Sequence, residues 1–324
     1  MPKAIRIQQT GGPEVMQYVD VEVGPPGPGE AQVRHHAIGL NYIDVYFRTG
    51  LYPQPLPGGI GLEGAGVVTA VGEGVTHVKP GDRVAYSDRP PGSYAELRNM
   101  PARPLVRLPR GIDFETAAAM MLKGMTVQYL FRRTYKLHKG QTILFHAAAG
   151  GVGLIAMQWA KALGVTVIGT VGSEEKAALA RRFGCDHTIL YKRENIVERV
   201  REITGGAMVP VVYDSVGKDT FLNSLDCAAP FGLVVLYGAA SGPAPAIEPE
   251  LLNKKGCLFL TRPSVFPHNA DPATFRANAV EVFQAIAAGH VQAAIGARFS
   301  LDEVAQAHRA AESRATTGAI VLHP

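Results

Sequence analysis

A cluster of small residues at positions 147–153 carries the clearest chemical signal in the chain. In the segment TILFHAAAGGVGLIAMQWAKALG (142–164), an apolar strand pattern runs into Ala148-x-Gly150-x-x-Gly153 and then into a helical pattern. Strand, glycine turn and helix in this order are typical of a dinucleotide-binding site. The bare backbone lets a pyrophosphate approach, and the helix N-terminus offers it unpaired N–H groups. The alternative is a helix that merely packs through small residues. We predict dinucleotide contacts at Ala149, Gly150, Gly151, Val152 and Gly153.

The end of the next strand bears on which dinucleotide would bind. An NAD site usually carries Asp or Glu there, to bind the ribose 2′-hydroxyl. Here the segment reads GTVGSEEK (169–176), so Gly172 and Ser173 occupy the turn and Lys176 follows one helical turn later. A small turn, a hydroxyl and a cation favour a 2′-phosphate and therefore NADPH. Glu174 and Glu175 count against this, because either could accept from a diol if it turned inward.

The elements that would position these residues fall into two stretches with different secondary-structure patterns. Residues 1–120 read as a β region punctuated by glycine and proline, followed by a helical run over 113–134 with Asp113 as its cap. From residue 142, apolar strands alternate with amphipathic helices, which is typical of a parallel sheet covered on both faces. The strands are expected at 142–147, 165–171, 187–190, 210–216, 231–238 and 256–262, and the helices between them at 150–163, 174–183 and 194–203.

The last part of the chain adds two helices, near 271–288 and 301–312, and a closing apolar strand, GAIVLHP (318–324), that could return to the first region. The fold class is therefore α/β, with a doubly wound parallel sheet in the middle of the chain.

Composition restricts the class of protein. The chain has 324 residues, of which 47% are hydrophobic and 19% charged, so two compact domains are expected. No apolar run approaches the roughly 20 residues that cross a bilayer, and the N-terminus lacks the apolar centre of a secretory signal. We expect a cytoplasmic protein with no membrane association. The net charge of +4 is mild and does not indicate a nucleic-acid partner. The three cysteines are far apart, so neither a disulfide framework nor a four-thiolate metal site is expected.

Many ordered segments together resemble the quinone oxidoreductase branch of the medium-chain dehydrogenase/reductase superfamily, the group that includes zeta-crystallin. The similarity covers essentially the whole chain. The segments that carry it are GGPEV (11–15), AIGLNYIDVYFRTGLYP (37–53), GLEGAGVV (61–68), VKPGDRVAY (78–86), LKGMTVQYL (122–130), HAAAGGVGLIAMQWAKALG (146–164), VVYDSVGKDTF (211–221), LNKKGCLFLTRPS (252–264) and ESRATTG (312–318).

This resemblance implies a GroES-like catalytic domain at 1–125, completed by 266–324, and a Rossmann NADP-binding domain at 126–265. It places the active site in the cleft between them. It also implies a homodimer formed through the edge strand of the Rossmann sheet, for which GCLFLTR (256–262) is the candidate. An apolar edge of this kind would otherwise invite aggregation.

Two departures from the zinc-dependent members of the superfamily indicate a metal-free enzyme. Where those members place a cysteine and a histidine ligand, this chain reads GLNYID and GLEGAG, so Asn41 and Leu62 stand there. Neither is a plausible zinc ligand. The cysteine-rich lobe for a structural zinc is also missing, and the ten histidines show no metal spacing. Without zinc, an alkoxide loses its usual stabiliser, which disfavours alcohol dehydrogenation.

The remaining chemistry is delivery of a hydride from NADPH to a quinone or another conjugated small-molecule acceptor. Such a reaction needs alignment with the nicotinamide and hydrogen-bond donors where oxyanion charge grows. Asn41, Tyr46 and Tyr52 are the candidate catalytic residues, and Asn41 and Tyr46 are also candidate cofactor contacts. Each tyrosine could instead be a core residue with a locally bonded hydroxyl. Asp44 could cap the turn or touch the nicotinamide.

The resemblance assigns further cofactor contacts, several of which have a plainer alternative. Tyr191 could stack on adenine or simply end its strand, and Arg314 could be a surface ion-pair partner. The residues assigned in this way are Tyr129, Tyr191, Ser215, Tyr237, Gly238, Arg262 and Arg314, beside Gly172, Ser173 and Lys176.

Three functions remain open. The first is a zinc-independent NADPH:quinone reductase, and the second an enone or enal reductase that uses the same cofactor. The third is a zeta-crystallin-like structural or RNA-binding protein, for which FRRTYKLHKG (131–140) is the only basic candidate. Cations at the C-terminus of a helix complement its dipole, which is the simpler explanation of that segment.

Overall fold

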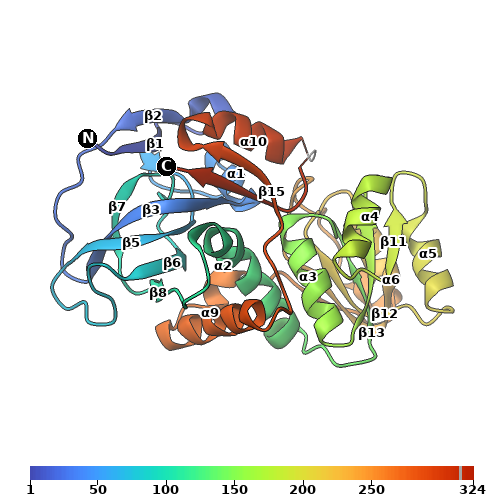
Figure 1. Ribbon diagram of the computed structural model, residues 1–324. Helices are drawn as coiled ribbons and strands as arrows, with labels where there is room; N and C mark the ends of the chain where they lie inside the picture. Colours follow the sequence, from blue (N-terminus) through green and yellow to red (C-terminus); the bar gives the residue numbers. More distant parts are fainter. Residues whose placement is uncertain (314–315) are drawn as a thin grey trace. The chain divides into compact units, whose positions relative to one another are not determined.

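The computed structural model describes residues 1–313 and 316–324 (Figure 1). The chain divides into two compact units. Unit 1 comprises Met1–Met125, His268–Ala288 and Gln292–Pro324, and unit 2 comprises Thr126–Pro267 and Gly289–Val291. Each has its own hydrophobic core. Val33, Val68 and Tyr86 belong to the core of unit 1, and Leu144 and Val212 to that of unit 2.

Unit 2 is built on a six-stranded sheet with the order β11-β10-β9-β12-β13-β14, and every neighbouring pair is parallel. The predicted doubly wound parallel sheet is confirmed. Its strands are β9 (Thr142–Phe145), β10 (Thr166–Val171), β11 (His187–Leu190), β12 (Val209–Asp214), β13 (Ala228–Leu236) and β14 (Phe259–Thr261). Its helices include α3 (Gly151–Ala162), α4 (Glu174–Arg182), α5 (Ile196–Ile203), α6 (Phe221–Cys227) and α7 (Glu250–Lys254).

The strand order reverses at β9. The chain moves outward through β10 and β11, then returns to β12 on the other side of β9. Because parallel crossovers are right-handed, α3 and α4 cover one face of the sheet, and α5 and α6 cover the other. The carboxyl ends of β9 and β12 therefore flank a topological switch point, where open α/β sheets bind their ligands.

Unit 1 contains a seven-stranded sheet and a three-stranded sheet. The larger has the order β15-β16-β3-β5-β6-β8, with β7 also paired to β3, and the smaller has the order β2-β1-β4. The closing strand pairs antiparallel with β3, Ile320 opposite Leu40, so the predicted return to the first region is confirmed. The strands are β1 (Lys3–Ile7), β2 (Gln17–Asp20), β3 (Glu30–Leu40), β4 (Gly58–Gly59), β5 (Glu63–Val71), β6 (Arg83–Ser87), β7 (Leu97–Pro101), β8 (Val106–Arg107), β15 (Ile295–Ser300) and β16 (Ala319–His323).

The helices of unit 1 include one that the β reading of residues 1–120 missed, α1 (Tyr42–Thr49). The others are α9 (Pro272–Ala287), α10 (Val304–Glu312) and the short turns η1 (Pro13–Val15) and η3 (Leu301–Glu303). The predicted run over 113–134 is α2 (Phe114–Tyr129), which continues as a π-helical turn, η2 (Leu130–Thr134). Its predicted cap is confirmed, since the Thr116 N–H donates to the Asp113 carboxylate over 2.6 Å.

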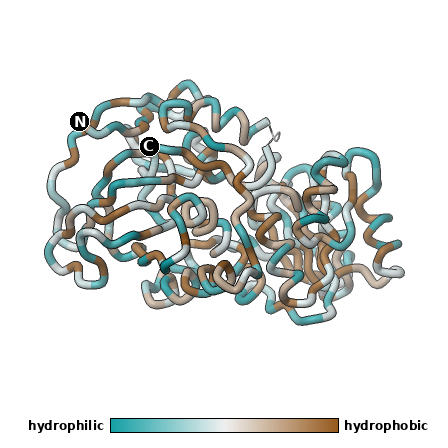
Figure 2. Tube along the Cα trace, in the orientation of Figure 1, coloured by the Kyte–Doolittle hydropathy of each residue, from teal (hydrophilic) through white to brown (hydrophobic). Residues whose placement is uncertain are grey.

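The tube in Figure 2 changes between hydrophobic and hydrophilic within single elements, as expected where one face is buried. In α5, for example, Ile196 and Val200 are buried one turn apart, while Glu198 and Arg201 are exposed. Within residues 1–313 and 316–324, no helix combines the length and the hydropathy needed to cross a membrane.

Candidate active site

The glycine turn of unit 2 has the strand–turn–helix context that the sequence predicts. Gly150 is the N-cap of α3, and the first intrahelical bond runs from the Leu154 N–H to the Gly150 carbonyl over 2.9 Å. The N–H groups of residues 151–153 precede that bond and are available to an anion. A Cβ on Gly153 would lie only 2.4 Å from the Ala147 carbonyl oxygen, so only glycine fits. This bare cradle fits the pyrophosphate of a dinucleotide.

A second cluster lies at the carboxyl ends of β10 and β11. Ser173 caps α4 by accepting from the Lys176 N–H over 3.3 Å. Its side chain also hydrogen-bonds with the exposed Glu175 carboxylate, and this bond lowers the pKa of Glu175. Tyr191 follows β11, and its hydroxyl would lie 2.8 Å from a Cβ on Gly172. The structure thus brings Gly172, Ser173, Tyr191 and the backbone of Lys176 together at the carboxyl ends of β10 and β11.

The loops that follow β12 and β13 are tied together at Asp214. Its backbone carbonyl accepts from the Tyr237 N–H over 2.8 Å and from the Gly238 N–H over 3.3 Å. Its carboxylate accepts from the Val216 N–H over 2.8 Å. A Cβ on Gly238 would lie 2.4 Å from the Ser215 carbonyl oxygen, so the two loops touch through their backbones. Ser215, Tyr237 and Gly238 therefore lie together at the same edge of the sheet as the glycine turn.

Three other predicted cofactor contacts are Tyr129, Arg262 and Arg314. Tyr129 is buried at the last residue of α2, and Arg262 is exposed directly after β14. Arg314 lies outside the described residues. Their contacts to a cofactor stay predictions.

In unit 1, Asn41 is the N-cap of α1, and its amide is already engaged. The Nδ2 group donates to the Glu63 carboxylate over 2.7 Å and to the Gly39 carbonyl over 3.3 Å. Because a carboxylate only accepts, this contact fixes which end of the amide is nitrogen. The predicted donation from Asn41 to a substrate oxygen would require one of these two bonds to break.

The surroundings of Asn41 do not fit a zinc ion. Leu62 is fully buried and has no ligating atom. Glu63 is also fully buried, and it accepts from the Leu122 N–H over 2.7 Å and pairs with the Lys123 ammonium over 3.3 Å. Its oxygens are therefore committed to protein donors. Among the described residues, no three His, Cys, Asp or Glu side chains are grouped as metal ligands would be.

Asp44 adopts the capping role, which was one of its two predicted alternatives. Its Oδ2 accepts from the Asn41 N–H and from the Tyr94 hydroxyl, both over 2.9 Å. Its Oδ1 is buried without a hydrogen-bond partner in the described part of the chain. Burial raises the pKa of this carboxyl to about 7, although both hydrogen bonds act to lower it. Asp44 can therefore exchange a proton near neutrality.

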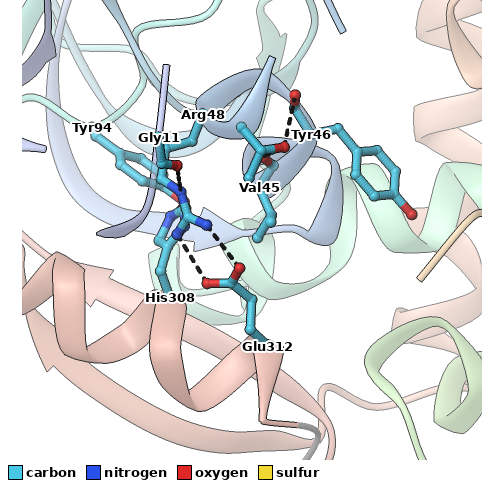
Figure 3. A network of polar contacts seen from close by, with 8 residues as sticks. Gly11, Val45, Tyr46, Arg48, Tyr94, His308 and Glu312 are labelled. Atoms are coloured by element: carbon cyan, nitrogen blue, oxygen red, sulfur yellow. Dashed lines mark hydrogen bonds and ion pairs between the residues drawn. The ribbon is translucent and has the colours of Figure 1, made fainter. Parts of the chain in front are cut away.

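Behind Asp44 lies a chain of mostly buried side chains that we call the Arg48 network, made of Asp44, Tyr94, His308, Arg48 and Glu312. Figure 3 shows the last four of them. The fully buried Arg48 forms two bonds to Glu312, over 2.7 and 2.9 Å, and donates to His308 Nδ1 over 3.2 Å. His308 Nε2 lies 3.1 Å from the Tyr94 hydroxyl. Burial, with the charge of Arg48 acting in the same sense, lowers the pKa of His308 to about 3. The network links α1 to α10.

Tyr46 and Tyr52 form an aromatic cluster on the other side of α1. Their ring centroids are 5.2 Å apart, and the Tyr42 ring lies 5.5 Å from that of Tyr46. Figure 3 shows the Tyr46 side chain pointing away from Arg48 and His308. Tyr46 is almost buried and Tyr52 is half-buried, so both have the packed ring that the core alternative requires. Their contacts to substrate stay predictions.

Sequence reasoning missed α1 and the Arg48 network for different reasons. For α1 a signal was present: Asn41 with Asp44 three residues later is a capping pattern, and Gly50 ends the helix with φ of 84°. For the network there was none, because Arg48 and His308 are 260 residues apart in the chain.

Comparison with known proteins agrees with this geometry. The alcohol dehydrogenase GroES-like domain family matches residues 27–110, and the zinc-binding dehydrogenase family matches residues 151–282. A quinone oxidoreductase of Pseudomonas aeruginosa is 55% identical over the full length of both chains. The chain belongs to the quinone oxidoreductase family. The predicted resemblance and the GroES-like plus Rossmann fold are thereby confirmed.

Two further relatives of this chain extend the comparison. The crystal structure of Escherichia coli quinone oxidoreductase complexed with NADPH superposes with a TM-score of 0.98. It is 46% identical, with 99% of this chain and all of that chain covered. A 2-haloacrylate reductase from Burkholderia is 45% identical over all of this chain and 99% of its own.

Proposed function

We propose that this chain is an NADPH-dependent quinone reductase that works without zinc. The observation that carries the proposal is the bare glycine turn at the switch point of unit 2, in a chain that is 55% identical over its full length to a quinone oxidoreductase. The E. coli relative in complex with NADPH supports the choice of cofactor, as does the presence of Lys176 in the first turn of α4, the helix that Ser173 caps.

We propose separate roles for the two parts of the chain. The Rossmann domain, 126–265, binds NADPH through residues 149–153 and the loops after β10, β12 and β13. The GroES-like domain, 1–125 completed by 266–324, is the catalytic part and presents α1 to the acceptor. When bound, NADPH supplies the hydride. The phenols of Tyr46 and Tyr52 then donate hydrogen bonds where negative charge grows on the acceptor oxygen. Their packed rings keep water away from it.

A second candidate is reduction of an activated carbon–carbon double bond. The relative named 2-haloacrylate reductase favours it, because a haloacrylate carries an alkene conjugated to a carboxylate. Hydride transfer to such an alkene needs the same cofactor and a donor for the enolate oxygen. An RNA-binding role is not favoured, since Arg132 and Arg133 lie in the last turn of η2, where cations complement a helix dipole.

We further propose a homodimer formed through β14. This strand is an edge of the parallel sheet, and Phe259 and Leu260 on it are 61% and 37% exposed. Phe231, which is 73% exposed, is held nearby by a bond from its N–H to the Gly256 carbonyl over 2.8 Å. An apolar edge strand is protected by pairing with a second copy. Light scattering on Phe259→Glu should give a monomer, and an unchanged mass would refute this interface.

We also propose that the protein works in the cytoplasm. Its three cysteines are all unpaired, which supports a reducing compartment.

The test of function is stopped-flow oxidation of NADPH with a panel of quinones and conjugated enones, repeated with NADH and after treatment with a chelator. We expect fast oxidation with quinones, a preference for NADPH over NADH, and no effect of the chelator. Faster turnover of enones than of quinones would select the second candidate. Loss of rate on chelation would overturn the metal-free assignment.

A further inference from the structure

The turn that begins the glycine cradle has a strained backbone. Ala147 has φ of 56°, a left-handed conformation that residues other than glycine rarely adopt. Its carbonyl accepts from the Gly150 N–H over 2.9 Å and, together with the Ala148 carbonyl, excludes a side chain at Gly153. The direction of the Ala147 peptide groups therefore decides where the N–H groups of the turn point.

A chain of buried side chains holds this peptide. The Ala147 N–H donates to Thr170 Oγ1 over 3.3 Å, and that hydroxyl lies 3.0 Å from His146 Nδ1. His146 Nε2 lies 3.0 Å from the Ser224 hydroxyl, which is 2.7 Å from the Asp214 carboxylate. We call Thr170, His146, Ser224 and Asp214 the His146 network. All four are at most 2% exposed.

The direction of every hydrogen bond in this network follows from its anionic end. A carboxylate only accepts, so Ser224 donates its one proton to Asp214. The Thr220 carbonyl, 3.1 Å from the Ser224 hydroxyl, can also only accept, so it cannot supply a proton to Ser224. Ser224 must therefore accept from His146 Nε2–H, which leaves Nδ1 to accept from the Thr170 hydroxyl. Because Ser224 donates to the aspartate and the histidine donates to the serine, this set cannot act as a nucleophile with its general base.

The same carboxylate also fixes the loop after β12. Asp214 accepts from the N–H groups of Val216 and Gly217, over 2.8 and 3.0 Å, and from the Thr220 hydroxyl over 2.8 Å. One network thus joins the turn after β9 and the loop after β12 through the end of β10, beside the switch point.

We infer that Thr170, His146 and Ser224 are positioning residues that set the glycine turn and the Asp214 loop for the dinucleotide before it binds. The inference rests on the proposed binding of NADPH. A preset cradle loses no free energy in ordering itself on binding, so breaking the network should weaken NADPH binding. It should leave the turnover of the saturated enzyme nearly unchanged.

The test compares Thr170→Val, which keeps the shape but removes the hydroxyl, with Thr170→Ser, which keeps the hydroxyl. NADPH dissociation constants are measured by fluorescence titration, together with KM, kcat and the melting temperature. Thr170→Val should raise the NADPH Kd and KM about tenfold, the effect of one broken buried hydrogen bond, with kcat within about twofold of wild type. Thr170→Ser should stay within about twofold of wild type in Kd.

Ser224→Ala provides a second variant should Thr170→Val fail to fold. It removes the acceptor of His146 with little change of volume and should raise Kd to a similar extent. Combining the two substitutions should raise Kd no further than either alone, because both act through His146. A lowered melting temperature with an unchanged Kd in Thr170→Val or Ser224→Ala would reduce the network to a structural role and overturn the inference. Wild-type protein that fails to bind NADPH would instead refute the proposed function.

Discussion

Each unit holds a buried hydrogen-bond network around a neutral histidine, His308 in unit 1 and His146 in unit 2. In one network a cation sets the position of the histidine proton, and in the other an anion does. In unit 1 the cation Arg48 faces His308 Nδ1, which must accept, so Nε2 carries the proton toward Tyr94. In unit 2 the anion Asp214 acts through Ser224 and requires a proton on His146 Nε2. The tautomer is the same. The charge of Arg48 adds to the effect of burial in lowering the pKa of His308, whereas the charge of Asp214 opposes burial at His146.

The difference in charge between the two networks indicates different roles in the two units. The Arg48 network contains the Arg48–Glu312 ion pair and joins helices that are distant in sequence, so we expect it to contribute mainly to the stability of unit 1. The His146 network has one charge and a chain of hydroxyls, and it joins backbone turns within unit 2. It is therefore suited to positioning backbone N–H groups.

The largest expected effect comes from removing the cation of unit 1. Arg48→Met leaves the Gly11 carbonyl, His308 Nδ1 and the Glu312 carboxylate without their donor. The free energy of unfolding should fall by about 3 kcal/mol, near the lower end for a broken buried ion pair because Glu312 is partly exposed. Urea denaturation measures it. Glu312→Gln, which keeps Arg48 hydrogen-bonded, is the matched control and should cost less than half as much. Equal losses of stability in Arg48→Met and Glu312→Gln would show that the cation matters no more than its ion-pair partner.

The free energy of unfolding should depend on pH in opposite senses through Asp44 and through the two histidines. Below pH 6.5 the unfolded chain protonates a histidine that the folded chain keeps neutral, so His308 and His146 each lower stability as pH falls, by up to about 1.4 kcal/mol per pH unit. The carboxyl of Asp44, with its pKa raised to about 7, binds a proton in the folded state first, so it adds stability as pH falls from 7.5 to 5.5.

Asp44→Asn should therefore lose about 2 kcal/mol more than wild type when the pH is lowered from 7.5 to 5.5. Urea denaturation at the two pH values gives both differences. A variant that follows the wild-type curve would mean that Asp44 titrates in its ordinary range. His146→Gln should lose less stability than wild type over the same fall in pH, because it lacks the histidine that only the unfolded chain protonates.

A smaller effect is expected at the cation that faces the adenosine phosphate in our proposal. Lys176→Ala should raise the NADPH KM about fivefold, which corresponds to about 1 kcal/mol, since one charge-assisted contact is lost. The NADH KM should stay within about twofold. Steady-state kinetics with both cofactors decides, and an equal rise for both would contradict the assignment of Lys176 to the 2′-phosphate.

The smallest effect on stability is expected at Tyr46, whose side chain points away from the Arg48 network (Figure 3). Tyr46→Phe should change the free energy of unfolding by less than about 1 kcal/mol and slow turnover about threefold, because one donor to the acceptor oxygen is lost. Tyr94→Phe is the comparison, since its hydroxyl belongs to the network and its loss should act on stability. Unchanged kcat in Tyr46→Phe would exclude that hydroxyl from the reaction.

Sequence reasoning succeeded where the signal was local. The strand, glycine turn and helix at 142–162 were found because each depends on residues that are neighbours in the chain, and the cap of α2 at Asp113 for the same reason. The engagement of Asn41 with Glu63 was not found, because their partnership joins the end of β3 to the start of β5 and leaves no trace in spacing. The same holds for Ser224 and His146, which are 78 residues apart.

The sequence by itself determined the fold class, the family and the position of the glycine turn, since hydrophobic period and backbone freedom are properties of short segments. Only the tertiary structure decided which polar side chains are committed to one another and where each histidine carries its proton. Those choices follow from excluding water around groups that are distant in the chain, where a buried donor or acceptor must find its partner within the protein.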